Sequence, residues 1–236
     1  MKPNTAMRVL PIQAVLFDLD GVLVDSRAPI ARSINHALTR HGLPSRPEES
    51  LHPWIGPPLH DTFVTLLAEA SADVTLAASC VAAYRERYRA ASLEETHAFP
   101  GVAGLVARLA ERAALAVATS KPVEFAGAIL HTLGLAASFR AVVGPPLDAR
   151  AEPKAQTVER ALARLGLPAR TGAPAVMVGD RRFDVEAGRA HGLRTVGVTW
   201  GIGSARELRD AGADDLVESP EELEALLDPL LAPRRR

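Results

Sequence analysis

The sequence predicts an α/β fold, with a doubly wound, Rossmann-like parallel sheet and an inserted α-helical cap domain. Two observations support this prediction. From about residue 98 onward, short apolar runs alternate with helical stretches, which is typical of a parallel sheet covered by helices on both faces. Residues 27–97, in contrast, show helical patterns and no strand-like run bounded by turn signals.

Six apolar runs are expected to form the strands of the sheet. The first run precedes the helical segment, and the other five follow it. Helices are expected between the strands, including one over residues 122–133 and one over residues 153–165. The expected strands are residues 14–18, 114–119, 139–144, 173–180, 194–199 and 214–219.

The segment between the first two strands is expected to fold as a separate helical unit. It contains three helical patterns and a proline-rich stretch, residues 43–58, that predicts a loop or short turns. Cys80 is expected to be buried in the third helix. The expected helices are 28–41, 59–70 and 75–91. The expected domains are a core of residues 12–26 and 98–231, a cap of residues 27–97, and tails at 1–11 and 232–236.

Composition excludes several classes of protein. A length of 236 residues, a hydrophobic content of 47% and a net charge of -1 indicate a folded domain without a polyanion-binding surface. A single cysteine excludes an internal disulfide, and the N-terminus shows no apolar leader. No apolar stretch approaches the roughly 18 residues that span a bilayer. We therefore expect a cytoplasmic monomer or homodimer with neither a nucleic-acid nor a membrane partner.

Polar side chains follow several of the expected strands. The stretch AVLFDLDGVLVDS, residues 14–26, places Asp18 and Asp20 after the first strand. Thr119 ends the second strand, Asp180 ends the fourth, and Lys154 opens the helix after the third. Because ligands bind at the carboxyl ends of strands in open parallel sheets, these groups are expected to meet in one crevice.

This set of groups predicts phosphoryl transfer. Crowded carboxylates repel one another unless a cation joins them, and their hard oxygen atoms favour Mg²⁺. A hydroxyl and an ammonium group complement a phosphate. One aspartate can then serve as the nucleophile that forms an aspartyl-phosphate, and a second can serve as general acid and base.

Four stretches also resemble, in order, the four motifs of the haloacid dehalogenase superfamily: FDLDGVLVDS, ATSKP, EPKAQ and VMVGDRRFD. The likeness runs from about residue 12 to about residue 227. The segment between the first two motifs is similar to the helical cap of the phosphoglycolate phosphatase-like branch, which includes 5′-nucleotidases. The resemblance implies the same fold as the strand pattern predicts, with Mg²⁺ as cofactor.

The resemblance implies a role for each matching residue of the first motif. Asp18 would attack the phosphorus atom, carry the covalent phosphate and contact the metal. Asp20 would protonate the leaving oxygen, later deprotonate the attacking water, and bind Mg²⁺ through its backbone carbonyl. Gly21 would permit the tight turn that directs the chain toward the cap.

The other three motifs supply the remaining groups that the resemblance implies. Thr119 and the adjacent Ser120 would hold phosphate oxygens. Lys154 would neutralise the nucleophile and the phosphate. Asp180 would bind Mg²⁺ directly, and Asp184, one helical turn later, would orient the metal or its waters.

Other residues have two open interpretations. Lys121 is either a solvated lysine or a contact to the site, and Arg150 is either a helper residue or loop surface. Residues 54–58 form either a substrate-facing loop or ordinary packing. Asp184 has the alternative of an exposed helix acid, and residues 181–182, both arginines, are expected to be solvated or paired with acids.

The expected function is Mg²⁺-dependent hydrolysis of a small phosphorylated metabolite such as phosphoglycolate or a nucleoside monophosphate. Asp20 and Asp180 argue against dehalogenation, and the absence of lysine between Asp25 and Pro100 argues against Schiff-base phosphonate cleavage. A β-phosphoglucomutase-like phosphotransferase stays open as an alternative. So does a receiver-like signalling module, although receivers lack a cap insert and an acid two residues after the nucleophile.

Overall fold

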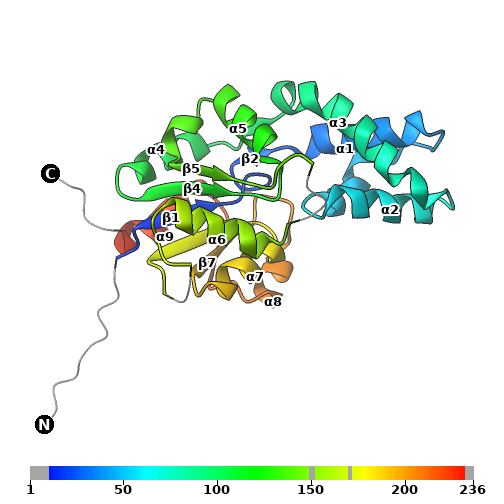
Figure 1. Cartoon of the computed structure of the whole chain (residues 1–236). Coiled ribbons are helices and arrows are strands. Elements are labelled where there is room, and N and C mark those ends of the chain that lie inside the picture. The colour runs from blue at the N-terminus through cyan, green and yellow to red at the C-terminus, as the bar shows by residue number, and fades with distance from the viewer. Residues whose placement is uncertain (1–10, 149–151, 170–171, 232–236) are drawn as a thin grey trace, which may run out of the picture.

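The computed structural model describes residues 11–148, 152–169 and 172–231. Six parallel strands form one sheet in the order β5-β4-β1-β6-β7-β8 (Figure 1). Each expected strand overlaps an observed one, so the predicted doubly wound α/β fold is confirmed. The strands are β1 (Ala14–Phe17), β4 (Ala114–Ala118), β5 (Ala141–Val143), β6 (Ala175–Gly179), β7 (Arg194–Val198) and β8 (Asp215–Val217).

The central strand β1 brings the segments of the site together. All four of its residues are buried, as expected for a strand covered on both faces. Phe17 pairs in parallel register with Val117 of β4 and with Val178 of β6. The chain therefore leaves these three strands at the same edge of the sheet, which is where Asp18 begins the next loop.

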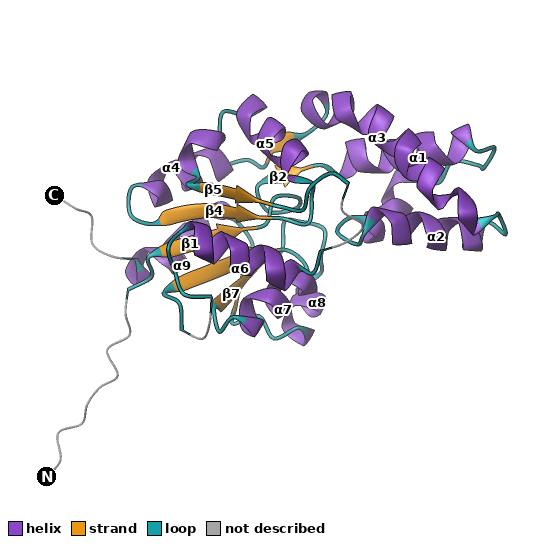
Figure 2. Ribbon diagram, viewed as in Figure 1, coloured by secondary structure: helices purple, strands orange, loops and turns teal. Residues whose placement is uncertain are grey.

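Helices cover both faces of the sheet (Figure 2). On one face, α6 and α7 bury small and aliphatic side chains against the alanine-rich side of β1 and β4. On the other face, α4, α5 and α9 pack against the side that contains Phe17. The helix α8 packs beside β7 and α7. The bounds are α4 (Val102–Ala110), α5 (Val123–Thr132), α6 (Lys154–Arg164), α7 (Arg182–Ala190), α8 (Ala205–Asp210) and α9 (Pro220–Leu227).

A separate group of helices lies at the end of the sheet toward which the strands point (Figure 1). Its apolar side chains, including the fully buried Cys80, form a cluster distinct from the two clusters on the sheet, and Phe125 of α5 joins it. A 3₁₀ helix occupies the proline-rich stretch in which short turns are expected. The elements are α1 (Arg27–Arg40), η1 (Glu48–Trp54), α2 (Leu59–Glu69), η2 (Val74–Leu76) and α3 (Ala77–Glu94).

A two-stranded antiparallel ribbon joins these helices to the sheet. In it, β2 (Val24–Asp25) pairs with β3 (His97–Ala98), so the outgoing and returning chains lie side by side. The sequence predicts no strand within residues 27–97. That prediction is wrong at its last residue, because His97 belongs to β3. Two residues are too few to produce a period, so no pattern could indicate this ribbon. Among the described residues, no helix has the length and apolar character needed to cross a membrane.

Candidate active site

Three carboxylates meet at the carboxyl edge of the sheet. Asp18 follows β1, Asp180 follows β6, and Asp184 lies in the first turn of α7. One oxygen atom from each lies within 4.8 Å of the other two, a spacing that could hold a metal ion. Asp180 and Asp184 are buried, and Asp18 is 9% exposed. From the sequence, Asp184 is expected to orient the metal or its waters. In the structure, its carboxylate lies in the same cluster as those of Asp18 and Asp180.

One lysine contacts two members of the cluster. Lys154, the first residue of α6, places its Nζ 2.7 Å from Asp18 Oδ1 and 2.8 Å from Asp184 Oδ1. Burial by itself would lower the pKa of Lys154, but the carboxylates of Asp18 and Asp184 outweigh that effect and raise it. The buried ammonium group therefore stays charged and neutralises part of the carboxylate cluster.

Asp180 lacks such a partner. Its Oδ2 accepts a 2.7 Å hydrogen bond from the Ile202 N–H, whereas its buried Oδ1 has no partner among the described residues. Burial raises the pKa of Asp180 well above its usual value, and Asp184 and Asp18 raise it further. Burial also raises the pKa of Asp184, to about 6, against the opposing effect of Lys154. Charge is thus crowded around Asp180.

This imbalance fits a divalent cation. Three carboxylates against the single ammonium group of Lys154 leave two negative charges when all are ionised. An unpaired buried carboxylate oxygen is costly unless something binds it. All the donors are hard oxygen atoms, which suit cations such as Mg²⁺ and Ca²⁺ better than softer metals. The residues present therefore fit such an ion.

Two glycines allow the cluster to be this compact. Gly21 has a φ of +84°, and a Cβ atom there would lie 2.1 Å from Asp180 Oδ2. A Cβ at Gly179 would lie 2.0 Å from the Cβ of Asp184. Any side chain at either position would push the carboxylates apart. The glycine that follows Asp20 in the first motif thus serves both the turn and the approach of Asp180.

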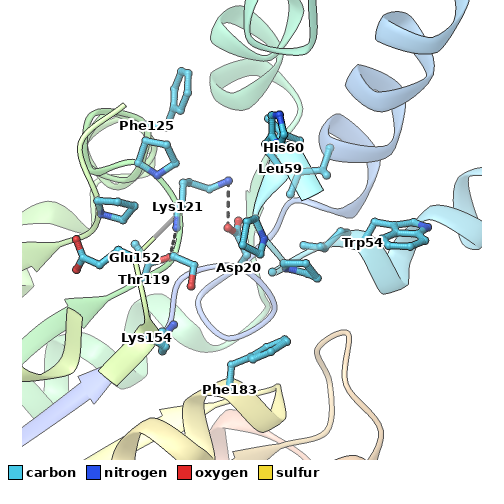
Figure 3. Close-up of a pocket in the computed structure, with 18 of the residues that line it drawn as sticks. Asp20, Trp54, Leu59, His60, Thr119, Lys121, Phe125, Glu152, Lys154 and Phe183 are labelled. Carbon is cyan, nitrogen blue, oxygen red and sulfur yellow. Dashed lines mark hydrogen bonds and ion pairs between the residues drawn. The ribbon is translucent and has the colours of Figure 1, made fainter. Parts of the chain in front are cut away.

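The carboxylate of Asp20 belongs to a second group of contacts. Its Oδ1 accepts a hydrogen bond from Ser26 Oγ at 2.5 Å, and Lys121 Nζ lies 3.1 Å from its Oδ2 (Figure 3). Lys121 also donates to the hydroxyl of Tyr88 in α3. Between the two interpretations that the sequence leaves open for Lys121, the structure favours contact with the site, because this lysine is only 8% exposed.

The expected phosphate-binding residues lie beside these groups. Thr119 is buried directly after β4, and its Oγ1 accepts a 3.1 Å hydrogen bond from the backbone N–H of Lys121. The neighbouring Ser120 is exposed. Thr119, Ser120 and Lys154 all line the cavity that also contains Asp18, so the groups predicted from separate motifs share one space.

That cavity has a volume of about 650 Å³. Its charged end is formed by the loops that follow β1 and β4 and by the start of α6. Its other walls come from η1, the start of α2, and α3, together with side chains of the core, so residues 54–58 do face the cavity (Figure 3). The apolar and aromatic lining residues include Ile30, Trp54, Ile55, Pro57, Leu59, Val81, Tyr84, Tyr88, Phe125, Phe183 and Ile202.

The two arginines after Asp180 have partners. Arg181 bonds to Glu207 at 3.0 Å and donates to the Ile55 carbonyl at 2.6 Å, which links the core to the loop after η1. Arg182 pairs with Glu186 at 3.2 Å. The expected pairing with acids is confirmed for both, although the contact with Ile55 is not evident from sequence. Arg150 lies outside the described residues.

Sequence reasoning missed several residues that line the cavity. Tyr88 appears in the sequence only as part of a helical stripe, which is equally typical of ordinary core packing. Burial, and then the charge of Asp20, raise the pKa of Tyr88 well above its usual value, so its hydroxyl stays neutral. Glu152 and Phe183 also line the cavity. Neither residue stands out from its neighbours by spacing or composition.

Comparisons with known proteins agree with this geometry. The family model described as haloacid dehalogenase-like hydrolase matches residues 15–198. The chain is 37% identical to a 5′-nucleotidase of Pseudomonas aeruginosa, over 83% of this chain and 86% of that protein. It is 38% identical to the tyrosine-protein kinase PtkA of Mycobacterium tuberculosis over 82% of its own length, but it spans only 64% of PtkA.

Solved structures support the same relationship. The crystal structure of a predicted phosphatase from Clostridium acetobutylicum matches with a TM-score of 0.84 at 33% identity, covering 94% of this chain and 100% of that one. The family match extends over most of the chain and includes Asp18, Asp20, Thr119, Lys154 and Asp180. The chain therefore belongs to the haloacid dehalogenase-like hydrolase family.

Proposed function

We propose that this enzyme is a Mg²⁺-dependent phosphatase that hydrolyses a phosphomonoester through an aspartyl-phosphate intermediate. One observation carries the proposal. The carboxylate of Asp18 lines a large cavity, is held by Lys154, and lies next to a buried carboxylate oxygen of Asp180 that has no partner among the described residues. A nucleophile, a cation site and a space for substrate thus adjoin one another.

Seven residues would hold or orient the metal and the phosphate. Asp18 and Asp180 would hold Mg²⁺ with the backbone carbonyl of Asp20, and Asp184 is near enough to orient the ion or its waters. The bound ion would neutralise charge on the phosphate oxygens. On the other side, Thr119, the adjacent Ser120 and Lys154 would hold those oxygens. These are the ammonium, hydroxyl and backbone donors that suit a phosphate.

The reaction would proceed in two displacements at phosphorus. In the first, a carboxylate oxygen of Asp18 forms a bond to phosphorus, the ester P–O bond breaks, and Asp20 gives its proton to the leaving oxygen. In the second, water attacks the aspartyl-phosphate while Asp20 takes the proton of that water, and the bond between phosphorus and Asp18 breaks. Phosphate leaves, and both aspartates return to their starting forms.

We further propose that residues 27–97 act as a cap over a core of residues 12–26 and 98–231. The β2–β3 ribbon contains both connections between the two parts, so a small change there would move the helices as a unit. The contact of Arg181 with the Ile55 carbonyl supports closure over the cavity. Closure would exclude bulk water from the site. Without that water, the electrostatic interactions between the charged side chains and the substrate would be stronger.

The cavity supports a substrate larger than phosphoglycolate. About 650 Å³ lies in the range of pockets that enclose drug-sized ligands, and most of the wall beyond the phosphate end is apolar or aromatic. Phosphoglycolate would leave much of that space unfilled and would bring a second negative charge against apolar side chains. A nucleoside monophosphate, which has a planar base, matches both the volume and the aromatic lining better.

The test is phosphate release from a panel of phosphomonoesters, with wild type compared with Asp18→Asn. Nucleoside monophosphates, hexose phosphates and phosphoglycolate would be assayed with Mg²⁺ and again with a chelator. We expect Mg²⁺-dependent turnover, highest for a nucleoside monophosphate and lost in Asp18→Asn. Turnover without Mg²⁺ would contradict the metal site, and phosphate transfer to a sugar rather than to water would favour the mutase-like alternative.

A further inference from the structure

The described residues contain two lysines, and each contacts a different aspartate of the first motif. Lys154 contacts Asp18, whereas Lys121 lies 3.1 Å from Asp20. The side chain of Lys121 is only 5% exposed. A buried ammonium group needs partners that replace its hydration, and Asp20 is one of the two that Lys121 has among the described residues. The position of Lys121 is therefore built into the fold.

The second partner comes from the helical segment. The hydroxyl of Tyr88, in α3, accepts a hydrogen bond from Lys121 Nζ, which also lies 4.6 Å from the centre of the Tyr88 ring. Tyr88 is itself held in place by two aromatic rings. Tyr84 stacks on it with ring centres 5.1 Å apart, and Phe125 packs edge-on against it with ring centres 5.3 Å apart. The ammonium group thus bridges an aspartate of the core and a tyrosine of the cap.

This geometry differs from that of a phosphate-binding lysine. Such a lysine would direct its ammonium group at the space beside the nucleophile, where Lys154 already lies. Figure 3 shows Lys121 extending instead from the loop after β4 toward Asp20. Ser26 holds the other oxygen of the same carboxylate. Both oxygens of Asp20 therefore have fixed partners, which defines the orientation of the carboxylate.

We propose that Lys121 is a positioning residue for Asp20, and that Tyr88 holds Lys121 in place. The proposal rests on the function proposed above. As Asp20 gives its proton to the leaving oxygen, negative charge develops on its carboxylate, and the ammonium group of Lys121 is already there to stabilise it. Because Tyr88 belongs to the cap, this arrangement is complete only while α3 packs against the core.

The test exploits the acidity of the leaving group. Phenyl phosphates with different ring substituents have similar size, but a strongly acidic phenol leaves without help, whereas a weakly acidic one needs the proton of Asp20. Because kcat/KM includes steps only up to loss of the phenol, it isolates the first displacement. We expect Lys121→Met to lower kcat/KM about 100-fold for phenyl phosphate and less than about 10-fold for 4-nitrophenyl phosphate.

Three further variants separate positioning from simple structural damage. Lys121→Arg keeps the charge and should recover part of the loss for phenyl phosphate. Tyr88→Phe removes only the hydroxyl. It should make kcat/KM depend more steeply on the acidity of the leaving phenol, as Lys121→Met does, but by a smaller amount. Tyr84→Phe is the matched control, because its hydroxyl forms no hydrogen bond within the described residues, and it should leave that dependence unchanged.

The outcomes are distinct. An equal loss for all phenyl phosphates in Lys121→Met, with an unchanged melting temperature, would overturn the positioning role while leaving the phosphatase intact. Equal effects of Tyr88→Phe and Tyr84→Phe would overturn the part assigned to the cap. If Lys121→Met does not fold, Tyr88→Phe and Lys121→Arg test the positioning role instead. If neither variant changes how kcat/KM depends on the acidity of the leaving phenol, the role is overturned. A wild type with no Mg²⁺-dependent turnover would overturn the proposed function, and the positioning role with it.

Discussion

The two ends of the cavity are built in opposite ways. At the core end, charged groups gather from loops that directly follow strands and from the first turns of α6 and α7, and they are buried against one another. At the cap end, the wall consists mostly of apolar and aromatic side chains from η1, α2 and α3. The core end thus concentrates charge in a small buried volume, whereas the cap end is a mainly apolar packed surface that encloses part of the cavity.

This difference has an energetic consequence. Burial of apolar side chains at the cap end stabilises the folded protein, by about 25 cal/mol for each Å² removed from water. Burial of Asp180 and Asp184 beside Asp18 opposes folding, because like charges repel and lose hydration. Changes at the core end should therefore alter activity strongly and sometimes raise stability. Changes at the cap end should alter stability and substrate choice.

The largest expected effect is at Asp18, the proposed nucleophile. Asp18→Asn keeps the shape of the side chain but removes the carboxylate that is proposed to attack phosphorus, together with its charge pairing with Lys154. We expect kcat to fall by about 10⁴-fold or more, measured as phosphate release with Mg²⁺. A circular dichroism spectrum identical to that of wild type is the control. Residual activity of several per cent would contradict the assignment of Asp18.

A smaller effect on turnover is expected at Asp180, together with an opposite effect on stability. Asp180→Asn removes a buried charge whose pKa is already raised by burial and by Asp184 and Asp18. We expect the melting temperature of the metal-free protein to rise, while stabilisation by Mg²⁺ and turnover both fall, turnover by about 100-fold. Differential scanning fluorimetry with and without Mg²⁺ measures both changes. A metal-free variant less stable than wild type would contradict the idea that this end opposes folding.

The core end was the more predictable from sequence, for a physical reason. The strands β1, β4 and β6 are apolar runs, and Asp18, Thr119 and Asp180 follow them directly, so these three residues are marked by their position along the chain. A parallel sheet then brings those positions to one edge without further information. The close approach of Asp184 and Asp180 also depends on Gly179 and Gly21, whose role appears only with the third dimension.

The cap end was not predictable to the same degree. Its wall is formed where separate segments converge, and residues such as Tyr88 and Trp54 have the same spacing as any core residue of a helix or turn. The contact between Tyr88 and Lys121 joins positions 33 residues apart in sequence. No local pattern encodes such a pair, so the sequence left Lys121 open between solvent and site.

The pH dependence of metal binding tests the core end without mutation. In the metal-free protein, burial raises the pKa of Asp180 well above its usual value and that of Asp184 to about 6. The folded state then binds more protons than the unfolded chain, so its stability falls as pH rises from near 4 through these values. Since Mg²⁺ competes with those protons, its stabilising effect should grow with rising pH.

The measurement is the shift in melting temperature caused by a fixed Mg²⁺ concentration, compared at about pH 5.5 and about pH 8. We expect the larger shift at the higher pH, with most of the change near the pKa of Asp184. Asp180→Asn is the control, and its shift should be small at both values. A shift that is larger at the lower pH would contradict the charge repulsion inferred for this end.

The smallest effect is expected at the cap end. Trp54 and Phe183 both line the cavity, one from η1 and one from α7 (Figure 3). Replacing either with alanine removes apolar contact from a bulky leaving group but not from a small one. We expect KM for nucleoside monophosphates to rise about 10-fold, which corresponds to loss of one good apolar contact, while values for phosphoglycolate change little.

The control for these variants is Val74→Ala, since Val74 is an apolar side chain of η2 that is 44% exposed and lies outside the cavity lining. It should leave KM unchanged for every substrate. If Trp54→Ala and Phe183→Ala instead lowered kcat for large and small substrates alike, the apolar end of the cavity would affect the chemical step as well as substrate binding. Apolar side chains around the leaving group would then contribute to the reaction itself, by excluding water from Asp18 and Asp20.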